Sequence, residues 1–325
     1  MAAIAAFSVA VLGLTVGLDS GVWLTAIMMT LYAALLAQAW NILAGFGGQF
    51  SFGHALFFGV GAYVQVLAQL GGAAAGVPPA GLNAWAALAL AVGAAAVAGA
   101  LLGALSFRYG LKGSYFALVT LAFAEVFRIG AVSVAFTGGG VGLMLPLRES
   151  LAQMQFGSRR GAVFLVLAMV VVAVLITAWL RHSRFGAQLQ AVRDNEDAAR
   201  AVGVNPFTVK LGAITLSAAL MGAGGAFYVQ SFQYIDPGIA FGPASSVEAL
   251  VGAIVGGIGS LWGPLLGALV LHALGETTRN LFGALPGLNM VIYGAVLIVI
   301  VMFLPRGLAG MGHSVRELWR GRRDG

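Results

Sequence analysis

Long apolar stretches separated by short polar breaks leave this chain few folds to adopt. A helix needs about 20 apolar residues to cross the hydrocarbon core of a bilayer. The stretches that meet or approach this length are residues 2–18, 22–44, 52–70, 84–107, 114–136, 161–180, 209–232, 245–274 and 288–304. Charged residues make up 9% of the chain and hydrophobic residues 60%, which nearly excludes a soluble protein and excludes a disordered one. We predict an all-α polytopic membrane protein with one transmembrane domain over residues 1–325.

The basic residues indicate how the chain is oriented. Residues 181–210 and the tail 305–325 are rich in arginine, and such segments favour the cytoplasmic side. Two cytoplasmic segments are separated by an even number of crossings, so residues 245–274 contribute either none or two. Gly256-Gly257 interrupts this stretch and predicts two short helices or a re-entrant hairpin. We therefore expect about ten crossings, with both termini cytoplasmic and a cytoplasmic basic tail at 305–325.

Two glycine pairs lie inside apolar stretches, Gly47-Gly48 in the first half and Gly256-Gly257 in the second. Paired Gly-interrupted segments are typical of the central pathway of transporters, whereas small residues also serve close helix packing. We favour a broken helix at the path for residues 47–51 and helix packing for Asn41. The polar residues beside the two glycine pairs, which complete the set of path candidates, are Asn41, Gln49, Ser51, His54 and Ser260.

Histidine carries no metal-site signal in this chain. His54 stands alone in an apolar context and is expected to be a hydrogen-bond partner, and the other histidines show no metal-ligand spacing. We therefore expect no metal site. The formal net charge of +6 is explained by the cytoplasmic segments, and no basic and aromatic interleaving indicates nucleic-acid binding.

The segment 183–210 is the most polar part of the interior of the chain. Asp194, Glu196 and Asp197 fit the first turn of a short helix, with Asp194 as its expected cap. Gly203 fits the position just after that helix ends, and Asn205-Pro206 fits the start of the next. These signals predict a compact helix–turn–helix at the membrane face. On physical grounds it is equally a solvated connection or a docking surface.

Several motifs in this order resemble known permeases. Asp197-Ala198-Ala199 followed by Gly203 resembles the EAA loop of ABC importer permeases, with Asp in place of Glu. A larger set of motifs is similar to the LivM family of branched-chain amino acid permeases, and the similarity runs from about residue 31 to residue 310. These motifs are WNILAGFGGQFSFGHALFFGVGAY (40–63), GSYFALVTLAFAEVFRI (113–129), TGGGVGL (137–143), the block 183–210, SAALMGAGGAFY (217–228), EALVGAIVGGIGSLWGPLLGA (248–268) and FLPRGLAG (303–310).

The resemblance implies a subunit of a type II importer in the bacterial inner membrane. Such a permease pairs with a homologous second permease and two cytoplasmic ATP-binding subunits, and an extracytoplasmic binding protein delivers the solute. Segment 183–210 would be the coupling segment that docks on an ATPase and drives alternating access. The residues implied for that coupling are Arg193, Asp194, Glu196, Asp197, Ala198, Ala199 and Gly203. One departure is Ala187-Gln188, where the family often has an arginine after the glycine.

No stretch matches the phosphate-binding pattern G-x-x-x-x-G-K-[ST]. We therefore expect no enzymatic activity and no cofactor on this chain, with ATP and Mg²⁺ on the partner subunits. Branched-chain amino acids are the expected solutes, and urea, short amides, other amino acids and aromatic acids stay open. A secondary carrier without an ATPase is a further alternative, and a membrane-embedded enzyme is a remote one.

Glu125 and Arg128 lie three residues apart inside the stretch 114–136. Ionisable groups in a span are costly and usually face the interior of the bundle, and this spacing lets them pair on one helix face. We favour a structural in-membrane ion pair over a proton relay or a contact with the solute.

Overall fold

The computed structural model describes residues 2–71 and 81–282, together with 291–292, 294–295, 298–299, 302 and 307–310. The predicted stretch 288–304 and tail 305–325 lie for the most part outside the described residues. The helices are α1 (Ala2–Gly17), α2 (Gly21–Asn41), α3 (His54–Leu70), α4 (Ala84–Arg108), α5 (Gly113–Ser133), α6 (Arg159–His182), α7 (Arg184–Asp194), α8 (Glu196–Ala201), α9 (Pro206–Phe232), α10 (Pro237–Phe241), α11 (Pro243–Gly256) and α12 (Gly263–Phe282). A π-helix, η1 (Ile42–Phe46), continues α2, and two short 3-10 turns are η3 (Ala135–Thr137) and η4 (Leu151–Gln153).

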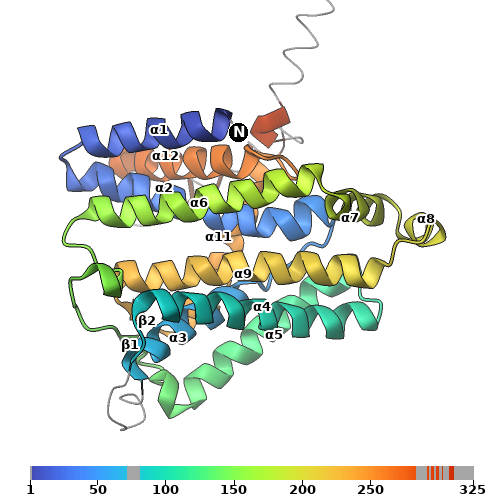
Figure 1. The fold of residues 1–325 in the computed structure, drawn as a ribbon, viewed down its shortest axis with the longest axis horizontal. Coiled ribbons are helices and arrows are strands. Elements are labelled where there is room, and N and C mark those ends of the chain that lie inside the picture. Colours follow the sequence, from blue (N-terminus) through green and yellow to red (C-terminus); the bar gives the residue numbers. More distant parts are fainter. Residues whose placement is uncertain are drawn as a thin grey trace, which may run out of the picture.

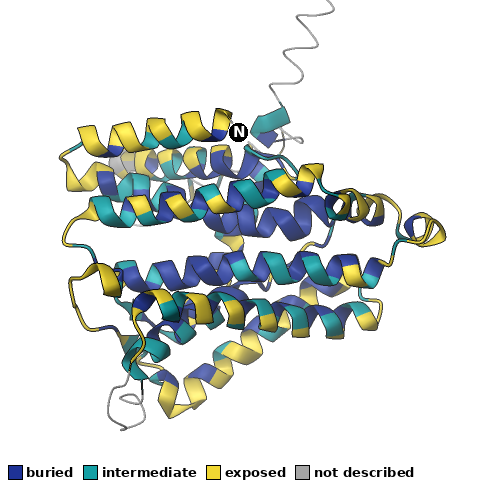
Figure 2. Cartoon of the chain, in the orientation of Figure 1, coloured by how far each residue is buried: buried dark blue, intermediate teal, exposed yellow. Residues whose placement is uncertain are grey.

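The long helices pack in two groups that meet at α2 and α9 (Figure 1). In one group α9 packs along α3 and α4, and in the other α2 packs against α6, α11 and α12. Figure 2 shows that buried residues concentrate on α9 and the second half of α2, where the two groups meet. At one end of the bundle a two-residue strand, β1 (Leu143–Met144), pairs antiparallel with β2 (Tyr234–Ile235). The short helices α7 and α8 project at the other end (Figure 1).

Small residues let α4 and α9 approach closely. Most of the buried positions of α4 are alanine or glycine, three or four residues apart on one face of the helix. On α9, a side chain added at Gly222 would collide with Ala95 of α4, and one added at Gly225 would collide with the Phe58 carbonyl of α3. Helices in lipid gain association mainly from this kind of close packing. This explains part of the high glycine and alanine content of the chain.

The stretch 245–274 is divided as the sequence predicts. Helix α11 ends at Gly256 and α12 begins at Gly263, and the turn between them is not helical. The two helices run back along one another, because Gly256 lies against Gly263 while Gly252 lies against Gly267. The predicted division of this stretch into two helices is therefore confirmed, although α12, with 20 residues, is longer than expected.

Six helical segments of the described residues are long and apolar enough to cross a membrane. They are Gly21–Phe46, Ala84–Arg108, Gly113–Ser133, Arg159–His182, Pro206–Phe232 and Pro237–Gly256. Two shorter apolar helices, Ala2–Gly17 and His54–Leu70, accompany them. The predicted helical, multi-pass architecture is thus present, while the count of ten crossings and the position of the termini stay predictions.

Candidate functional site

The first helix break follows α2 and is held by its own polar groups. After η1, residues 48–53 are not helical, and α3 begins at His54. The indole nitrogen of Trp40 donates to the Ser51 carbonyl at 2.8 Å, and the Gly53 amide donates to Ser51 Oγ at 3.3 Å. Gln49 Nε2 donates to the Gly47 carbonyl at 3.4 Å. Irregular backbone at membrane depth persists only where its polar groups find partners within the protein or a water-filled cavity. The break predicted at residues 47–51 is therefore present, and most of its residues are buried or half-buried, while Phe50 is exposed.

The two predicted breaks meet at Asn41. Its side-chain Nδ2 donates to the Ser260 carbonyl at 3.0 Å, and its Oδ1 accepts from the Gly259 amide at 2.8 Å. The hydroxyl of Ser260 accepts from the Gly263 amide at 2.9 Å, where α12 begins. Asn41 is fully buried. It acts through hydrogen bonds across a helix interface, as expected, and the interface it crosses joins the two interrupted segments.

Gln38 reinforces this junction and was missed in the sequence. Its Nε2 donates to Thr177 Oγ1 of α6 at 2.9 Å and to the Leu261 carbonyl of the second break at 3.3 Å. Gln38 and Asn41 lie three residues apart and therefore share one face of α2. Two amide side chains with that spacing in an otherwise apolar stretch were the signal that could have identified it.

His54 does not lie open to a cavity. It is buried, and its Nε2 lies 2.9 Å from Ser217 Oγ of α9. Ser217 in turn donates to the Ala39 carbonyl at 2.6 Å. The imidazole therefore fastens the start of α3 to α9, as expected of a hydrogen-bond partner.

Arg193 connects the segment 183–210 to this junction. Its Nη1 donates to the Gly45 carbonyl at 2.9 Å, and Nε donates to the neighbouring Asp194 at 3.0 Å. Gly48, with φ of +65°, lies under the arginine stem, because a Cβ there would come within 2.5 Å of Arg193 Cγ. Gly259 also packs here, because a Cβ added to it would lie 3.2 Å from the Gly45 carbonyl oxygen and 3.7 Å from Arg193 Nη1. The guanidinium thus lies where both breaks converge.

The segment 183–210 folds into two short helices, and one capping prediction is wrong. Helix α7 runs to Asp194, and Asn195, rather than Asp194, caps α8 by accepting from the Asp197 and Ala198 amides at 3.1 and 3.0 Å. Asn195 takes the position predicted for Asp194 because both residue types are good N-caps. Asp194 is not available as the cap, since it is still the last residue of α7. Asn205 caps α9 with Pro206 at its first turn, as predicted.

Gly203 ends α8 as the sequence predicts. Its φ is +87°, and its amide donates to the Arg200 carbonyl while the Val204 amide donates to the Ala199 carbonyl, both at 3.0 Å. These two bonds are the Schellman pattern, which requires a left-handed residue at this position. The turn that follows α8 is therefore fixed in direction.

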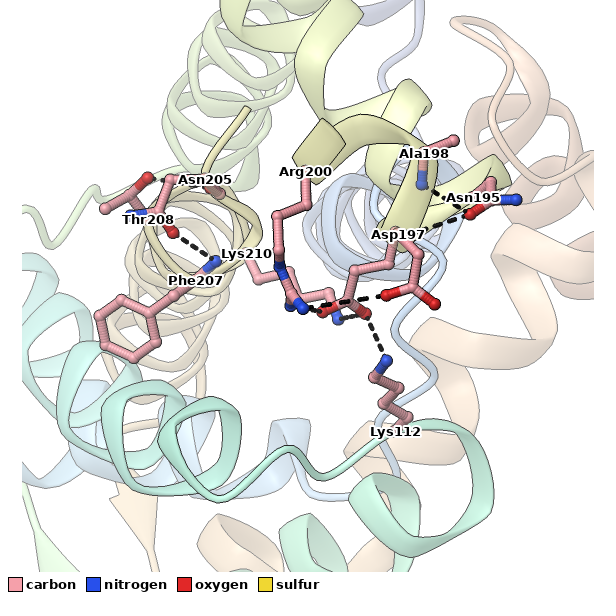
Figure 3. Close-up of polar contacts among 10 residues, drawn as sticks. Lys112, Asn195, Asp197, Ala198, Arg200, Asn205, Phe207, Thr208 and Lys210 are labelled. Atoms are coloured by element: carbon pink, nitrogen blue, oxygen red, sulfur yellow. Dashed lines mark hydrogen bonds and ion pairs between the residues drawn. The ribbon is translucent and has the colours of Figure 1, made fainter. Parts of the chain in front are cut away.

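Glu196 holds α8 against the body of the protein. Its carboxylate lies 2.7 Å from Lys210 Nζ of α9 and 3.1 Å from Lys112 Nζ, at the start of α5, and Arg200 approaches to 3.4 Å (Figure 3). Burial raises the pKa of Glu196, but hydrogen bonds from Lys210 and Lys112 outweigh it and leave that pKa below its ordinary value. Lys210 is itself buried and lies over the Phe107 ring.

The chain contains only these two lysines. The contact of both lysines with Glu196 was not predicted, although two lysines at predicted cytoplasmic span ends and one nearby carboxylate were a usable signal. Glu196 thereby links α8 to α9 and to the start of α5.

The rest of α8 faces outward. Asp197 is 87% exposed, and Ala198 and Gly203 are exposed, whereas Ala199 is buried. Val202 is 79% exposed and places an apolar side chain at the tip of an otherwise polar segment. Val202 was not predicted as part of the site, although an apolar residue in a charged segment could have indicated an exposed contact. We call Asp197 and Ala198, together with Val202 and Gly203 just beyond the end of the helix, the outward face of α8.

Glu125 and Arg128 pair as expected but do not face the interior of the bundle. Arg128 Nε and Nη2 donate to the two carboxylate oxygens of Glu125 at 2.8 and 2.6 Å. The two side chains are 49% and 35% exposed. The expectation of an inward position is therefore wrong, because the buried stripe of α5 runs along Phe116, Ala117, Thr120, Ala124 and Ala131 instead.

These features describe a multi-pass membrane protein with two joined helix breaks and a two-helix segment projecting from one end. The family described as branched-chain amino acid transport system / permease component matches residues 22–301. The chain belongs to that family, which confirms the resemblance drawn from the motifs.

Among curated proteins, the chain is 28% identical to the high-affinity branched-chain amino acid transport system permease protein LivM of Salmonella typhimurium, over 91% of this chain and 72% of that protein. The corresponding permease LivH of Escherichia coli is 27% identical over 42% of each chain. The nucleoside ABC transporter permease NupC of Lactococcus lactis is 30% identical over 46% of this chain and 49% of its own. No solved structure matches the chain.

Proposed function

We propose that this chain is the membrane subunit of an ATP-binding-cassette importer and forms half of a path for branched-chain amino acids. The observation that carries the proposal is the Arg193 contact. Charge-assisted hydrogen bonds are roughly twice as strong as neutral ones, and this one ties α7 to the Gly45 carbonyl at the first helix break. A movement of α8 therefore reaches the junction of the two breaks through packed helices.

Alternating access needs a cytoplasmic contact and a gate that respond together. The outward face of α8 offers the cytoplasmic contact, with Asp197 for a basic groove and Val202 for an apolar one. The junction at Asn41 offers the gate, because it joins segments from both halves of the chain. ATP and Mg²⁺ bind to two cytoplasmic ATP-binding subunits in this scheme, and an extracytoplasmic protein delivers the solute at the opposite end in the bacterial inner membrane. A homologous permease, of the kind LivH represents, completes the path.

Leucine, isoleucine and valine are the proposed solutes because LivM is a branched-chain amino acid permease by name. The similarity to the nucleoside permease NupC is confined to about half of each chain. It nevertheless makes a nucleoside a necessary competitor in any solute panel, beside urea, a short amide and an aromatic acid.

The test is uptake by the reconstituted complex. Proteoliposomes with both permeases, the two ATPases and the binding protein should accumulate labelled leucine only when ATP is supplied. Unlabelled valine should compete, and a nucleoside or urea should not. Gradient-driven uptake by this chain alone would establish a secondary carrier instead.

Coupling through α8 is tested by combining Asp197→Arg with Gly203→Val. The first change reverses the charge of the outward face, and the second puts a β-branched residue where φ is +87°. We expect uptake per ATP hydrolysed to fall about tenfold. The matched control is Asp19→Arg, which reverses an acidic residue that is 98% exposed. Full transport by the α8 double variant would contradict the coupling role.

A further inference from the structure

Helix α5 is held along one narrow stripe and is otherwise uncovered. Its buried residues fall on one face, and its packing partners are mainly α3 and α10. Figures 1 and 2 show α5 running obliquely to its neighbours with exposed residues along much of its length. The opposite face carries Leu118, Ala122, Glu125 and Ile129, which recur three or four residues apart, and the half-buried Arg128 lies at the edge of this face. We call these five residues the α5 front face.

The α5 front face differs in kind from the other exposed faces of the spans. The large exposed side chains of α4 are Trp85, Leu90, Val97, Leu101 and Leu105, and those of α6 are Phe164, Val172 and Trp179. Such faces suit lipid. Among the described residues in the interior of the six spans, Glu125 is the only exposed charged residue, while Arg128 beside it and Glu248 of α11 are half-buried and Lys210 is buried.

The position of the pair along α5 places it deep in the span. Glu125 is the thirteenth residue of a 21-residue helix, so it lies about 18 Å along an axis of about 30 Å. Charged groups at that depth cost several kcal/mol against lipid and face protein or a water-filled cavity instead. Something other than lipid therefore covers the α5 front face in the assembled protein.

We propose that the α5 front face lines the translocation path opposite the second permease, and that the Glu125–Arg128 pair is a contact point for a zwitterionic solute. This inference rests on the proposed function. The two side chains already satisfy one another through two hydrogen bonds, so they need no fixed partner residue. Both keep exposed surface on this chain, so a solute that reaches this face can contact them.

The chemistry of the pair matches the solute class. An amino acid carries one ammonium and one carboxylate, and Glu125 and Arg128 present the complementary charges side by side. The solute can exchange its charges with the pair, ammonium to Glu125 and carboxylate to Arg128, without leaving an unpaired charge at mid-depth. A solute without ionised groups can offer Glu125 and Arg128 only hydrogen bonds from uncharged groups, which replace their ion pair less well.

Accessibility of the α5 front face is the first test, and the chain is suited to it because it contains no cysteine. Single cysteines replace Leu118 and Ile129, which are 59% and 54% exposed, in the complete complex. Val97→Cys and Leu101→Cys on α4 are matched controls, at 58% and 61% exposed. A charged, water-soluble methanethiosulfonate should modify the α5 cysteines at least about tenfold faster than the α4 cysteines. The rate should change when ATP and vanadate trap the ATPases.

Uptake is the second test. Replacing both charges, Glu125→Gln with Arg128→Gln, should lower ATP-driven leucine uptake about tenfold, because charge-assisted contacts to the solute are lost. The control is the double change Glu276→Gln with Arg279→Gln, which removes another Glu–Arg pair of the same spacing, on α12. It should leave uptake near the wild-type rate. Leucine present during labelling should also slow modification of the α5 cysteines.

The outcomes separate the two proposals. If the wild-type complex shows no ATP-driven uptake, the importer function fails whatever α5 does. If it transports leucine but the α5 and α4 cysteines react equally slowly in every nucleotide state, the α5 front face is covered by lipid or packed protein and the inference is overturned. If the α5 cysteines react fast but the variant with Glu125→Gln and Arg128→Gln transports leucine normally, the ion pair is not a contact point for the solute, and that part of the proposal is overturned.

Discussion

Arg193 and Arg128 make opposite uses of the same chemistry. Each has an acidic neighbour within hydrogen-bond distance, Asp194 for one and Glu125 for the other. Arg193 also reaches inward to the Gly45 carbonyl, so it is part of the junction of the two helix breaks. Arg128 donates two hydrogen bonds to Glu125 and lies on an outer face of the chain. The first arrangement fixes a position, and the second leaves charge available to something outside the chain.

The largest expected effect concerns the junction that Arg193 touches. Asn41→Leu removes both hydrogen bonds to the second break and leaves the Gly259 amide and Ser260 carbonyl without their partner. An unsatisfied buried polar group costs about 1–3 kcal/mol, so the free energy of unfolding should fall by about 3 kcal/mol. Denaturant unfolding of the purified protein in detergent measures it.

The control for this change is Ser106→Ala. Ser106 is buried, and its hydroxyl has no hydrogen-bond partner among the described residues. Its removal should change stability by less than about 0.5 kcal/mol. Equal losses for the two variants would show that Asn41 does not hold the breaks together.

A smaller effect is expected from Arg193→Gln. The glutamine is too short to reach both Asp194 and the Gly45 carbonyl, so α7 loses its hold on the first break. Uptake per ATP hydrolysed should fall about tenfold, measured as leucine uptake and phosphate release in the same vesicles. Arg160→Gln, which breaks an ion pair with Asp19, should keep the wild-type ratio. An unchanged ratio for Arg193→Gln would place the coupling elsewhere.

The smallest effect concerns Glu196, which anchors α8 near Arg193. Its pKa in the folded state lies below the ordinary value of 4.5. The pairing therefore stabilises the fold above about pH 4.5 and is lost as pH falls further. Lys112 and Arg200 are exposed and add little, so most of the stabilisation comes from the nearly buried contact with Lys210, and we expect about 1 kcal/mol. Unfolding measured from pH 7 to pH 3.5 should slope less for Glu196→Gln than for the wild type, and parallel curves would contradict the pairing.

Local features of this fold were predictable, and the reason is periodicity and capping chemistry. Gly203 and Asn205-Pro206 mark helix ends because few residues accept those backbone angles or supply those caps. The break at residues 256–257 was predicted because two arginine-rich cytoplasmic segments must be separated by an even number of crossings. The choice between Asp194 and Asn195 as the cap failed because adjacent residues of equal capping ability differ only in tertiary context.

The long-range contacts were not predictable. Asn41 contacts Gly259, which is 218 residues away in the sequence. Neither stretch contains a pattern that predicts contact with the other. Glu125 and Arg128 were expected to face inward because ionisable groups inside a span usually do. Our proposal explains their outward position by a second subunit, and a single sequence does not display its partners.

Asn41 has a consequence for how the junction moves. Its amide group is one rigid plane, and both of its hydrogen bonds run to consecutive backbone residues of the second break. We therefore expect the two bonds to break together. In the proposed importer, a pull on α7 would separate the two helix breaks only after both hydrogen bonds are lost, so the junction would open in one step.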